Sequence, residues 1–173
     1  MNPIGKPFTF LLGLASICLT LTVALAASQA IRPASQTKPS GPVRARVSVP
    51  PLPSVGFAPV RPMDVVRATY DFAAQHPEIL KYVPCYCGCG SQGHKANESC
   101  FVARRDPKGN VLEWDTHGFG CTICVDVARE SMQMYMSGAD VHSIRAAIER
   151  KWGPGNSEGR TPTPAPPAKK SLN

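Results

Sequence analysis

The chain has 173 residues, with 19 Lys and Arg against 12 Asp and Glu and a formal net charge of +7. The positive charge lies in the terminal segments, because residues 62–153 carry 10 Lys and Arg against 11 Asp and Glu. This nearly neutral stretch excludes a nucleic-acid-binding domain, which would concentrate cations on one folded face. The length allows one small domain, whose hydrophobic core alone gives marginal stability.

Residues 1–30 have the pattern of a signal peptide or an N-terminal membrane anchor. Lys6 precedes an apolar run from Phe8 to Ala27, and small residues follow that permit cleavage after Ala30. The apolar run is also long enough to span a bilayer as an uncleaved anchor. In either case we expect the rest of the chain to be exported, to the periplasmic or extracellular face, as a secreted or membrane-anchored protein.

Two further segments are rich in proline. Residues 31–61 contain seven prolines and no acidic residue, and residues 154–173 contain five prolines. Proline does not fit a helix interior or a central strand, and both segments have few large apolar residues. We therefore expect a Pro-rich linker over 31–61, a Cys-rich domain over 62–153, and a disordered Pro-rich tail over 154–173.

Apolar residues within the domain recur at spacings of three and four, which is typical of helices with one buried face. The pattern predicts three main helices, over residues 62–75, 122–137 and 141–152. His76-Pro77 ends the first helix, and one more helical turn is expected over 78–81. Gly138 is placed to end the second helix, and Asp140 is placed to cap the third.

The remainder of the domain predicts a loop and a hairpin. Residues 85–97 are rich in Cys and Gly and show no periodicity. Two short β-like runs, Cys100–Ala103 and Val111–Trp114, flank a strong turn signal at Asp106–Asn110. The expected fold is therefore a small, mainly α domain of about three helices with a Cys/Gly-rich loop and a short β-hairpin, flanked by disordered Pro-rich tails.

The cysteines are the residues with the clearest chemical potential. Six of the seven lie in the predicted domain: Cys85, Cys87, Cys89, Cys100, Cys121 and Cys124. An even number in an exported domain permits a disulfide framework, with 15 pairings of six cysteines. The C-x-C-x-C spacing of residues 85–89 favours a metal site over disulfides. In an extended segment alternate side chains lie on one face, so the three thiols face the same way, at Cα separations that hinder disulfide formation between them. Cys121-x-x-Cys124 begins a helix, whose N-terminus favours thiolates that can hold one ion.

Two histidines flank these cysteines. His94 follows Cys89 at C-x4-H spacing, and His117 precedes Cys121 at H-x3-C spacing. Thiolates with imidazoles suit Cu(I) first and zinc second, whereas the oxygen ligands that Ca²⁺ or Mg²⁺ need are not clustered here. The six cysteines, His94 and His117 are therefore the candidate metal ligands of an extracytoplasmic protein for metal handling or storage. The expected partner is the metal ion, together with the membrane if the N-terminal segment stays uncleaved.

Two other functions remain open. Cys121 and Cys124 could form the redox pair of a thiol-disulfide protein, although no Val/Ile-rich strand precedes Cys121 as in thioredoxin-like folds. A disulfide-stapled interaction module explains the number of cysteines but not the C-x-C-x-C spacing. A metal-binding module ranks first, and an enzyme ranks below it.

The segment Pro-Cys-Tyr-Cys-Gly-Cys-Gly at residues 84–90 resembles the bacterial exported family named after its PCYCGC motif. The likeness covers roughly residues 72–152 and includes Gly93-His94, Cys100-Phe101, Trp114-Asp115-x-His117 and Gly120-Cys121-x-x-Cys124. Members of that family resemble lipoproteins, and this chain departs from their pattern because Ile17, not a small residue, precedes Cys18. The family has no settled activity, so the resemblance implies a class of protein and leaves its function open.

Overall fold

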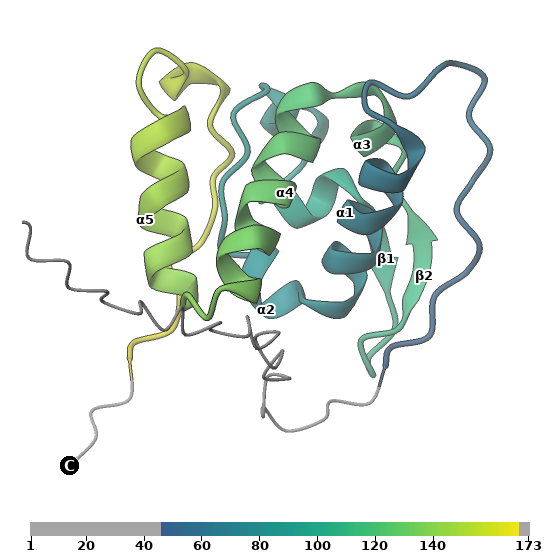
Figure 1. Cartoon of the computed structure of the whole chain (residues 1–173), viewed down its shortest axis with the longest axis horizontal. Coiled ribbons are helices and arrows are strands. Elements are labelled where there is room, and N and C mark those ends of the chain that lie inside the picture. Colours follow the sequence, from purple (N-terminus) through teal and green to yellow (C-terminus); the bar gives the residue numbers. More distant parts are fainter. Residues whose placement is uncertain (1–45, 170–173) are drawn as a thin grey trace, which may run out of the picture. The chain divides into compact units, whose positions relative to one another are not determined.

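The structure is a computed structural model that describes residues 46–169 (Figure 1). The predicted signal peptide or membrane anchor over 1–30, with Cys18, lies outside these residues, and so does the first half of the predicted linker. Among the helices of residues 46–169, none combines the length and the apolar character needed to cross a membrane.

The described residues form five α-helices and one two-stranded sheet. In chain order these are α1 (Met63–Gln75), α2 (Pro77–Leu80), β1 (Val102–Arg105), β2 (Val111–Trp114), α3 (His117–Gly120), α4 (Thr122–Met136) and α5 (Val141–Trp152). Three short 3-10 turns accompany them: η1 (Cys89–Gln92), η2 (Asn97–Cys100) and η3 (Ser157–Gly159). The prediction of a small, mainly α domain with three main helices and a short hairpin is confirmed.

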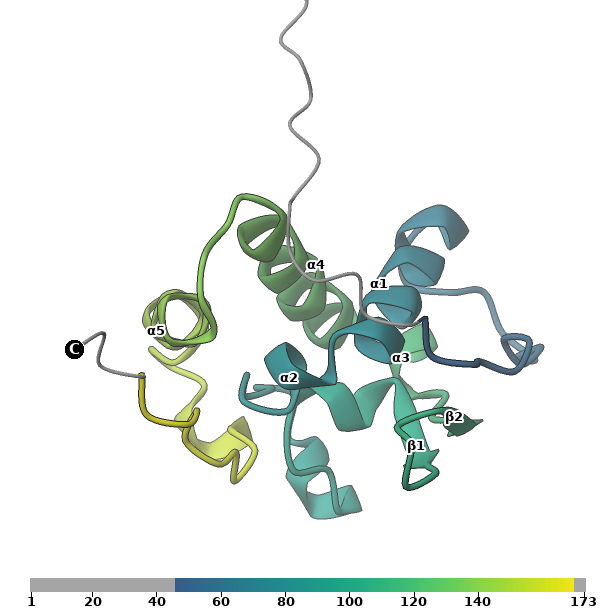
Figure 2. The same ribbon diagram turned by 90° about the horizontal axis from the view of Figure 1, so that it is seen from below.

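Helix α4 is the centre of the domain and lies between α1 and α5 (Figure 1, Figure 2). It also contacts α2, α3 and η2. Its buried face consists of small and β-branched side chains: Cys124, Val125, Val127, Ala128 and Ser131. These small side chains let several elements approach the first turns of α4, where Cys124 lies.

Helix α5 begins, and helix α4 ends, where local sequence signals predict. The Asp140 side chain accepts a hydrogen bond of 2.8 Å from the Ser143 backbone N–H and so caps α5. Gly138 has a φ of +88°, the left-handed conformation in which glycine commonly follows a helix. The chain therefore turns from α4 into α5 within four residues.

The hairpin is antiparallel, with Val102 opposite Trp114 and Arg105 opposite Val111. The predicted first strand began at Cys100, but residues 97–100 form η2 and β1 begins only at Val102. An aromatic cluster connects the hairpin to α1, since the Tyr70 ring lies 5.1 Å from that of Phe101 and 5.5 Å from that of Trp114. This cluster fixes the chain on either side of the hairpin.

The part of the predicted linker that is described, residues 46–61, has no helix or strand but packs on the domain. Trp114 Nε1 donates a hydrogen bond of 3.0 Å to the Pro50 carbonyl. The Arg61 guanidinium contacts both carboxylate oxygens of Asp126, at 2.9 and 2.5 Å. The predicted domain boundary at residue 62 is therefore too late, because proline excludes regular structure without excluding packing.

The segment after α5 also belongs to the domain, so the prediction of a disordered tail from residue 154 is wrong for residues 154–169. Thr161 is fully buried, and its backbone N–H donates a hydrogen bond of 2.9 Å to the Cys85 carbonyl. In Figure 1 this segment runs back along α5 beside the loop that follows α2. Its composition is poor in apolar residues. Hydrogen bonds to the backbone of that loop and polar contacts with α5, such as the Arg160–Glu149 ion pair of 2.8 Å, hold it in place.

Candidate metal centre

The loop after α2 brings the thiols of the C-x-C-x-C segment together. The sulfur atoms of Cys85 and Cys87 are 3.5 Å apart, and those of Cys85, Cys87 and Cys89 all lie within 4.8 Å of one another. Gly88 has a φ of +80°, a conformation that most other residues avoid, and it turns the chain between the second and third thiols. The predicted convergence of these three side chains is confirmed.

The first turn of α4 contributes the second pair of thiols. Cys121 is the N-cap residue, and its sulfur accepts a hydrogen bond of 3.4 Å from the Cys124 backbone N–H. The Cys124 sulfur lies 3.4 Å from that of Cys85 and 3.4 Å from that of Cys87. The sulfurs of Cys85, Cys87 and Cys124 thus form a nearly equilateral triangle that joins the loop to the helix.

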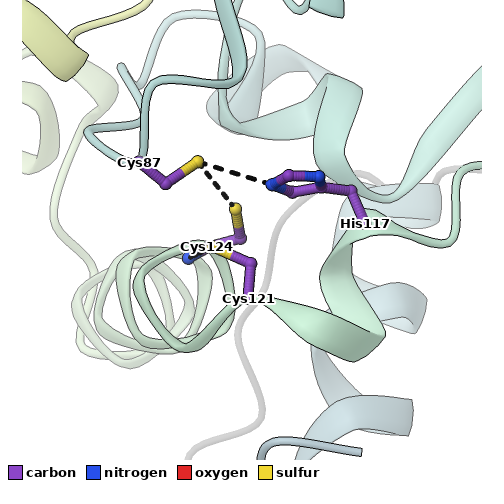
Figure 3. A group of neighbouring side chains, drawn as sticks. All are labelled: Cys87, His117, Cys121 and Cys124. Atoms are coloured by element: carbon purple, nitrogen blue, oxygen red, sulfur yellow. Dashed lines mark hydrogen bonds between the residues drawn. The ribbon is translucent and has the colours of Figure 1, made fainter. Parts of the chain in front are cut away.

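One imidazole lies beside this triangle. His117 opens α3, and its Nε2 lies 3.5 Å from the Cys87 sulfur (Figure 3). We call the four side chains drawn in Figure 3 the outer group: Cys87, His117, Cys121 and Cys124. Their ligand atoms all lie within 4.8 Å of one another. Cys124 is buried and the other three are half-buried.

A second set of ligand atoms lies deeper in the domain. Cys89, His94 and Cys100 are all buried, and one ligand atom from each lies within 4.8 Å of the others. The sulfurs of Cys89 and Cys100 are 3.6 Å apart. We call these three residues the inner group. Cys85 lies between the groups, because its sulfur is within 4.8 Å of those of Cys89, Cys100 and Cys124.

All eight predicted ligands therefore belong to one continuous cluster. The six cysteines of the described residues are free, and the closest sulfur pairs are 3.4–3.6 Å apart, well beyond the disulfide bond length of about 2.05 Å. This arrangement does not match a disulfide scaffold. It resembles the spacing of ligands around an ion, since a tetrahedral ion with bonds of about 2.3 Å separates its sulfurs by about 3.8 Å.

A family model described as "Protein of unknown function with PCYCGC motif" matches residues 54–166. The chain belongs to the PCYCGC family. The motif itself, Pro84 to Cys89, supplies three of the six clustered thiols. The matched range extends beyond 62–153 at both ends, in agreement with the packing of both flanking segments. Neither a curated protein nor a solved structure matches this PCYCGC protein.

Asp115 is a polar residue of the PCYCGC site that contacts both histidines of the cluster. Its Oδ1 accepts a hydrogen bond of 2.7 Å from the His117 backbone N–H, and its Oδ2 lies 3.3 Å from His94 Nε2. The Tyr70 hydroxyl donates to the Asp115 carbonyl at 2.6 Å and fixes the backbone there. The available signal was the Asp-x-His spacing, which places a carboxylate two residues before a candidate ligand.

Asn97 and Thr161 hold the backbone under the thiols. Asn97 Nδ2 donates a hydrogen bond of 3.1 Å to the Cys124 carbonyl, and the Cys85 backbone N–H donates one of 2.9 Å to Thr161 Oγ1. Both residues are fully buried. Neither could be found from sequence, because each contact joins segments that are distant in the chain.

The close packing of the thiols shifts their pKa values in opposite directions. Hydrogen bonds from Cys100, Cys124 and Cys87 lower the pKa of Cys85 to about 4. Hydrogen bonds to Cys100, Cys121 and other thiols instead raise the pKa of Cys124. The neighbouring Cys121 and Cys87 raise the pKa of His117 to about 10. Without an ion, the cluster therefore shares a few protons among closely packed sulfurs, and a cation can replace those protons.

An open groove of about 550 Å³ leads to the outer group. Cys87 lines it together with Tyr86, Ile123 and the loop from Gly155 to Gly159. Gly159 approaches the motif closely, since a Cβ atom there would lie 2.5 Å from the Tyr86 carbonyl oxygen. The C-terminal segment therefore forms one wall of the approach to Cys87.

Proposed function

We propose that this domain is an extracytoplasmic soft-metal-binding module that holds an ion in the outer group, with Cu(I) favoured and zinc second. The observation that carries the proposal is the convergence of the outer group, whose four ligand atoms all lie within 4.8 Å of one another and whose Cys87 and Cys124 sulfurs are 3.4 Å apart. Thiolates at this separation repel one another unless a cation lies between them. His117 Nε2, 3.5 Å from the Cys87 sulfur, adds a nitrogen ligand once an arriving cation displaces its proton.

The choice of metal rests on the chemistry and the number of the ligands. Thiolate and imidazole are soft or intermediate ligands, which suit Cu(I) and zinc. A structural zinc site takes four ligands in a closed tetrahedron. Six free thiols in one cluster exceed that requirement, and Cu(I) accommodates several thiolates at low coordination number. A role in metal handling or storage fits a site whose Cys87 faces an open groove.

The location outside the cytoplasm rests on the sequence of residues 1–30. Lys6, the following apolar run and the small residues up to Ala30 favour export, by cleavage or by anchoring. Six free thiols outside the cytoplasm would be exposed to oxidation, and a bound ion would protect them. Export and metal binding therefore support one another.

The second candidate is a thiol-disulfide redox protein. It is favoured by the position of Cys121, which is half-buried at the N-cap of α4, with Cys124 in the first turn of the same helix. The described residues, however, contain only a two-stranded antiparallel sheet and not the βαβ unit that carries such pairs in thioredoxin-like proteins. The metal-binding function ranks first for this reason.

Metal titration tests the proposal directly. Reduced protein is titrated anaerobically with Cu(I) against a chromophoric chelator, and the accessibility of Cys121 to an alkylating reagent is followed. Wild type should bind Cu(I), and the bound ion should protect Cys121 from alkylation. Cys87→Ser should weaken Cu(I) binding by at least about 10-fold, because even the loss of a residue that only contacts a ligand lowers metal affinity by that factor. His142→Gln, at a half-buried position whose ring nitrogen contacts the Pro167 carbonyl, is the control.

The redox candidate predicts a different result. If the metal-free protein turns over a test disulfide, if Cys121→Ser abolishes that turnover, and if wild type retains no Cu(I) or zinc, the metal-binding proposal is wrong.

A further inference from the structure

The inner group has the composition of a metal site of its own. Cys89 begins η1, His94 follows η1, and Cys100 ends η2, so three short segments meet at one point. The exposed fractions of these residues are 1%, 8% and 0%. A buried thiol pair 3.6 Å apart beside a buried imidazole has no role in the outer group, because the outer group shares none of these residues.

His94 provides an independent sign of a missing ligand. Its Nδ1 is buried and has no hydrogen-bond partner, and a buried polar atom without a partner normally destabilises a fold. Its Nε2 faces Asp115 Oδ2 at 3.3 Å. In metal sites, a ligating histidine usually gives its second nitrogen to a carboxylate in this way, which orients the ring toward the metal. An ion at the inner group would satisfy Nδ1.

Cys85 completes the inner set of ligands. Its sulfur lies within 4.8 Å of the sulfurs of Cys89 and Cys100. The eight ligands then divide into two sets of equal composition, each with three thiols and one imidazole. The outer set is Cys87, Cys121, Cys124 and His117, and the inner set is Cys85, Cys89, Cys100 and His94. The two sets touch at Cys85, whose sulfur lies 3.4 Å from that of Cys124 and 3.5 Å from that of Cys87.

We propose that the domain binds two soft-metal ions side by side, the second at an inner site of Cys85, Cys89, Cys100 and His94. This inference rests on the proposed function and adds the number and the arrangement of its sites. The inner ion is enclosed by protein, whereas the outer ion lies beside the groove that Cys87 lines. The two sites therefore differ in exchange rate, and the outer ion exchanges first with a chelator in solution.

Zinc is the probe that counts the sites, because a closed zinc site takes four ligands. Reduced protein is loaded anaerobically with zinc, desalted and analysed for metal per chain. Wild type should hold two zinc ions, which a chelator removes in a fast and a slow phase. Cys89→Ser/Cys100→Ser should hold one and lose the slow phase, and Cys121→Ser/His117→Gln should hold one and lose the fast phase.

If a double variant does not fold, single substitutions test the inner site instead. His94→Gln should weaken the slowly exchanging ion by at least about 10-fold and leave the other unchanged, as loss of one ligand predicts. His76→Gln, which alters a half-buried histidine at the end of α1, is the matched control.

The outcomes separate this inference from the proposed function. One zinc in wild type that survives in the inner double variant and disappears in the outer one overturns the second site and keeps the metal-binding function. A Cys89–Cys100 disulfide in protein isolated under anaerobic conditions overturns it too. Absence of both zinc and Cu(I) binding overturns the function itself.

Discussion

Asp115 links the two histidines of the cluster through one carboxylate. One of its oxygens accepts from the His117 backbone N–H at 2.7 Å and the other faces His94 Nε2 at 3.3 Å. Its own backbone is tied to the Tyr70 hydroxyl, so the carboxylate is fixed from the aromatic core. A single residue outside the set of ligands therefore sets the position of α3 and the orientation of the inner imidazole.

Substituting Asp115 should weaken metal binding without unfolding the domain. Asp115→Asn keeps the shape of the side chain but removes the charge that orients His94. Loss of such a partner typically lowers metal affinity about 10–100-fold. Chelator competition on the reduced protein measures the effect, with Asp71→Asn on the exposed face of α1 as control. Unchanged affinity for both ions would show that Asp115 has only a structural role.

The ligands could be predicted from sequence to the extent that their spacing is local. Cys85, Cys87 and Cys89 converge within five residues, where Gly88 in the left-handed conformation turns the chain into η1. The division into two sets could not be predicted, because it depends on which distant segments meet. His94 and His117 follow the same kind of spacing signal, yet the fold gives one to each group.

At the scale of elements, short segments depart most from the sequence pattern. Helices α1, α4 and α5 follow from local periodicity and end at recognisable signals. Helix α3, with the sequence His-Gly-Phe-Gly, is too short and too rich in glycine for any such signal. It forms because Phe119 packs 4.8 Å from the Tyr70 ring and Asp115 holds its first N–H.

In the C-terminal segment, residues 154–169, amino-acid composition predicts disorder incorrectly. Its prolines and its lack of apolar residues predict disorder, since disorder follows from insufficient apolar burial. Thr161 nevertheless makes two hydrogen bonds of 2.9 Å with the Cys85 backbone, and Thr163 Oγ1 donates one of 2.9 Å to the Lys95 carbonyl. Hydrogen bonds between buried polar groups hold this segment on the domain, and such bonds cannot be predicted from amino-acid composition.

Thr161→Val should therefore destabilise the domain. The substitution preserves the volume of the side chain but leaves the buried Cys85 N–H without its acceptor, which costs about 1–3 kcal/mol. Denaturant unfolding of the reduced, metal-free protein measures this loss. Ser157→Ala, at an exposed position of η3, should change stability by less than about 0.5 kcal/mol. Equal stability of wild type and Thr161→Val would restore the view of residues 154–169 as a dispensable tail.

At the scale of the whole molecule, the cluster joins segments that come from separate parts of the chain. The loop after α2, the η1 and η2 turns, α3 and the start of α4 all contribute ligand atoms. A small domain of this kind has a marginal hydrophobic core, and metal ions often supply the missing stability. Ions at these thiols would close several loops at once.

Metal removal should lower the stability of the domain by an amount that depends on the concentration of free metal. Binding to the native state alone adds RT ln(1 + [L]/Kd), or about 4 kcal/mol at a thousandfold excess over Kd. Reduced protein is unfolded by denaturant without metal and at several buffered concentrations of free zinc, and the midpoint should rise steadily with the logarithm of that concentration. Cys87→Ser should flatten this dependence because it removes a ligand of the outer group, whereas Ser157→Ala should reproduce the wild-type slope. A midpoint that does not depend on metal would mean that the thiol cluster is complete without an ion, and that neither site contributes to the fold.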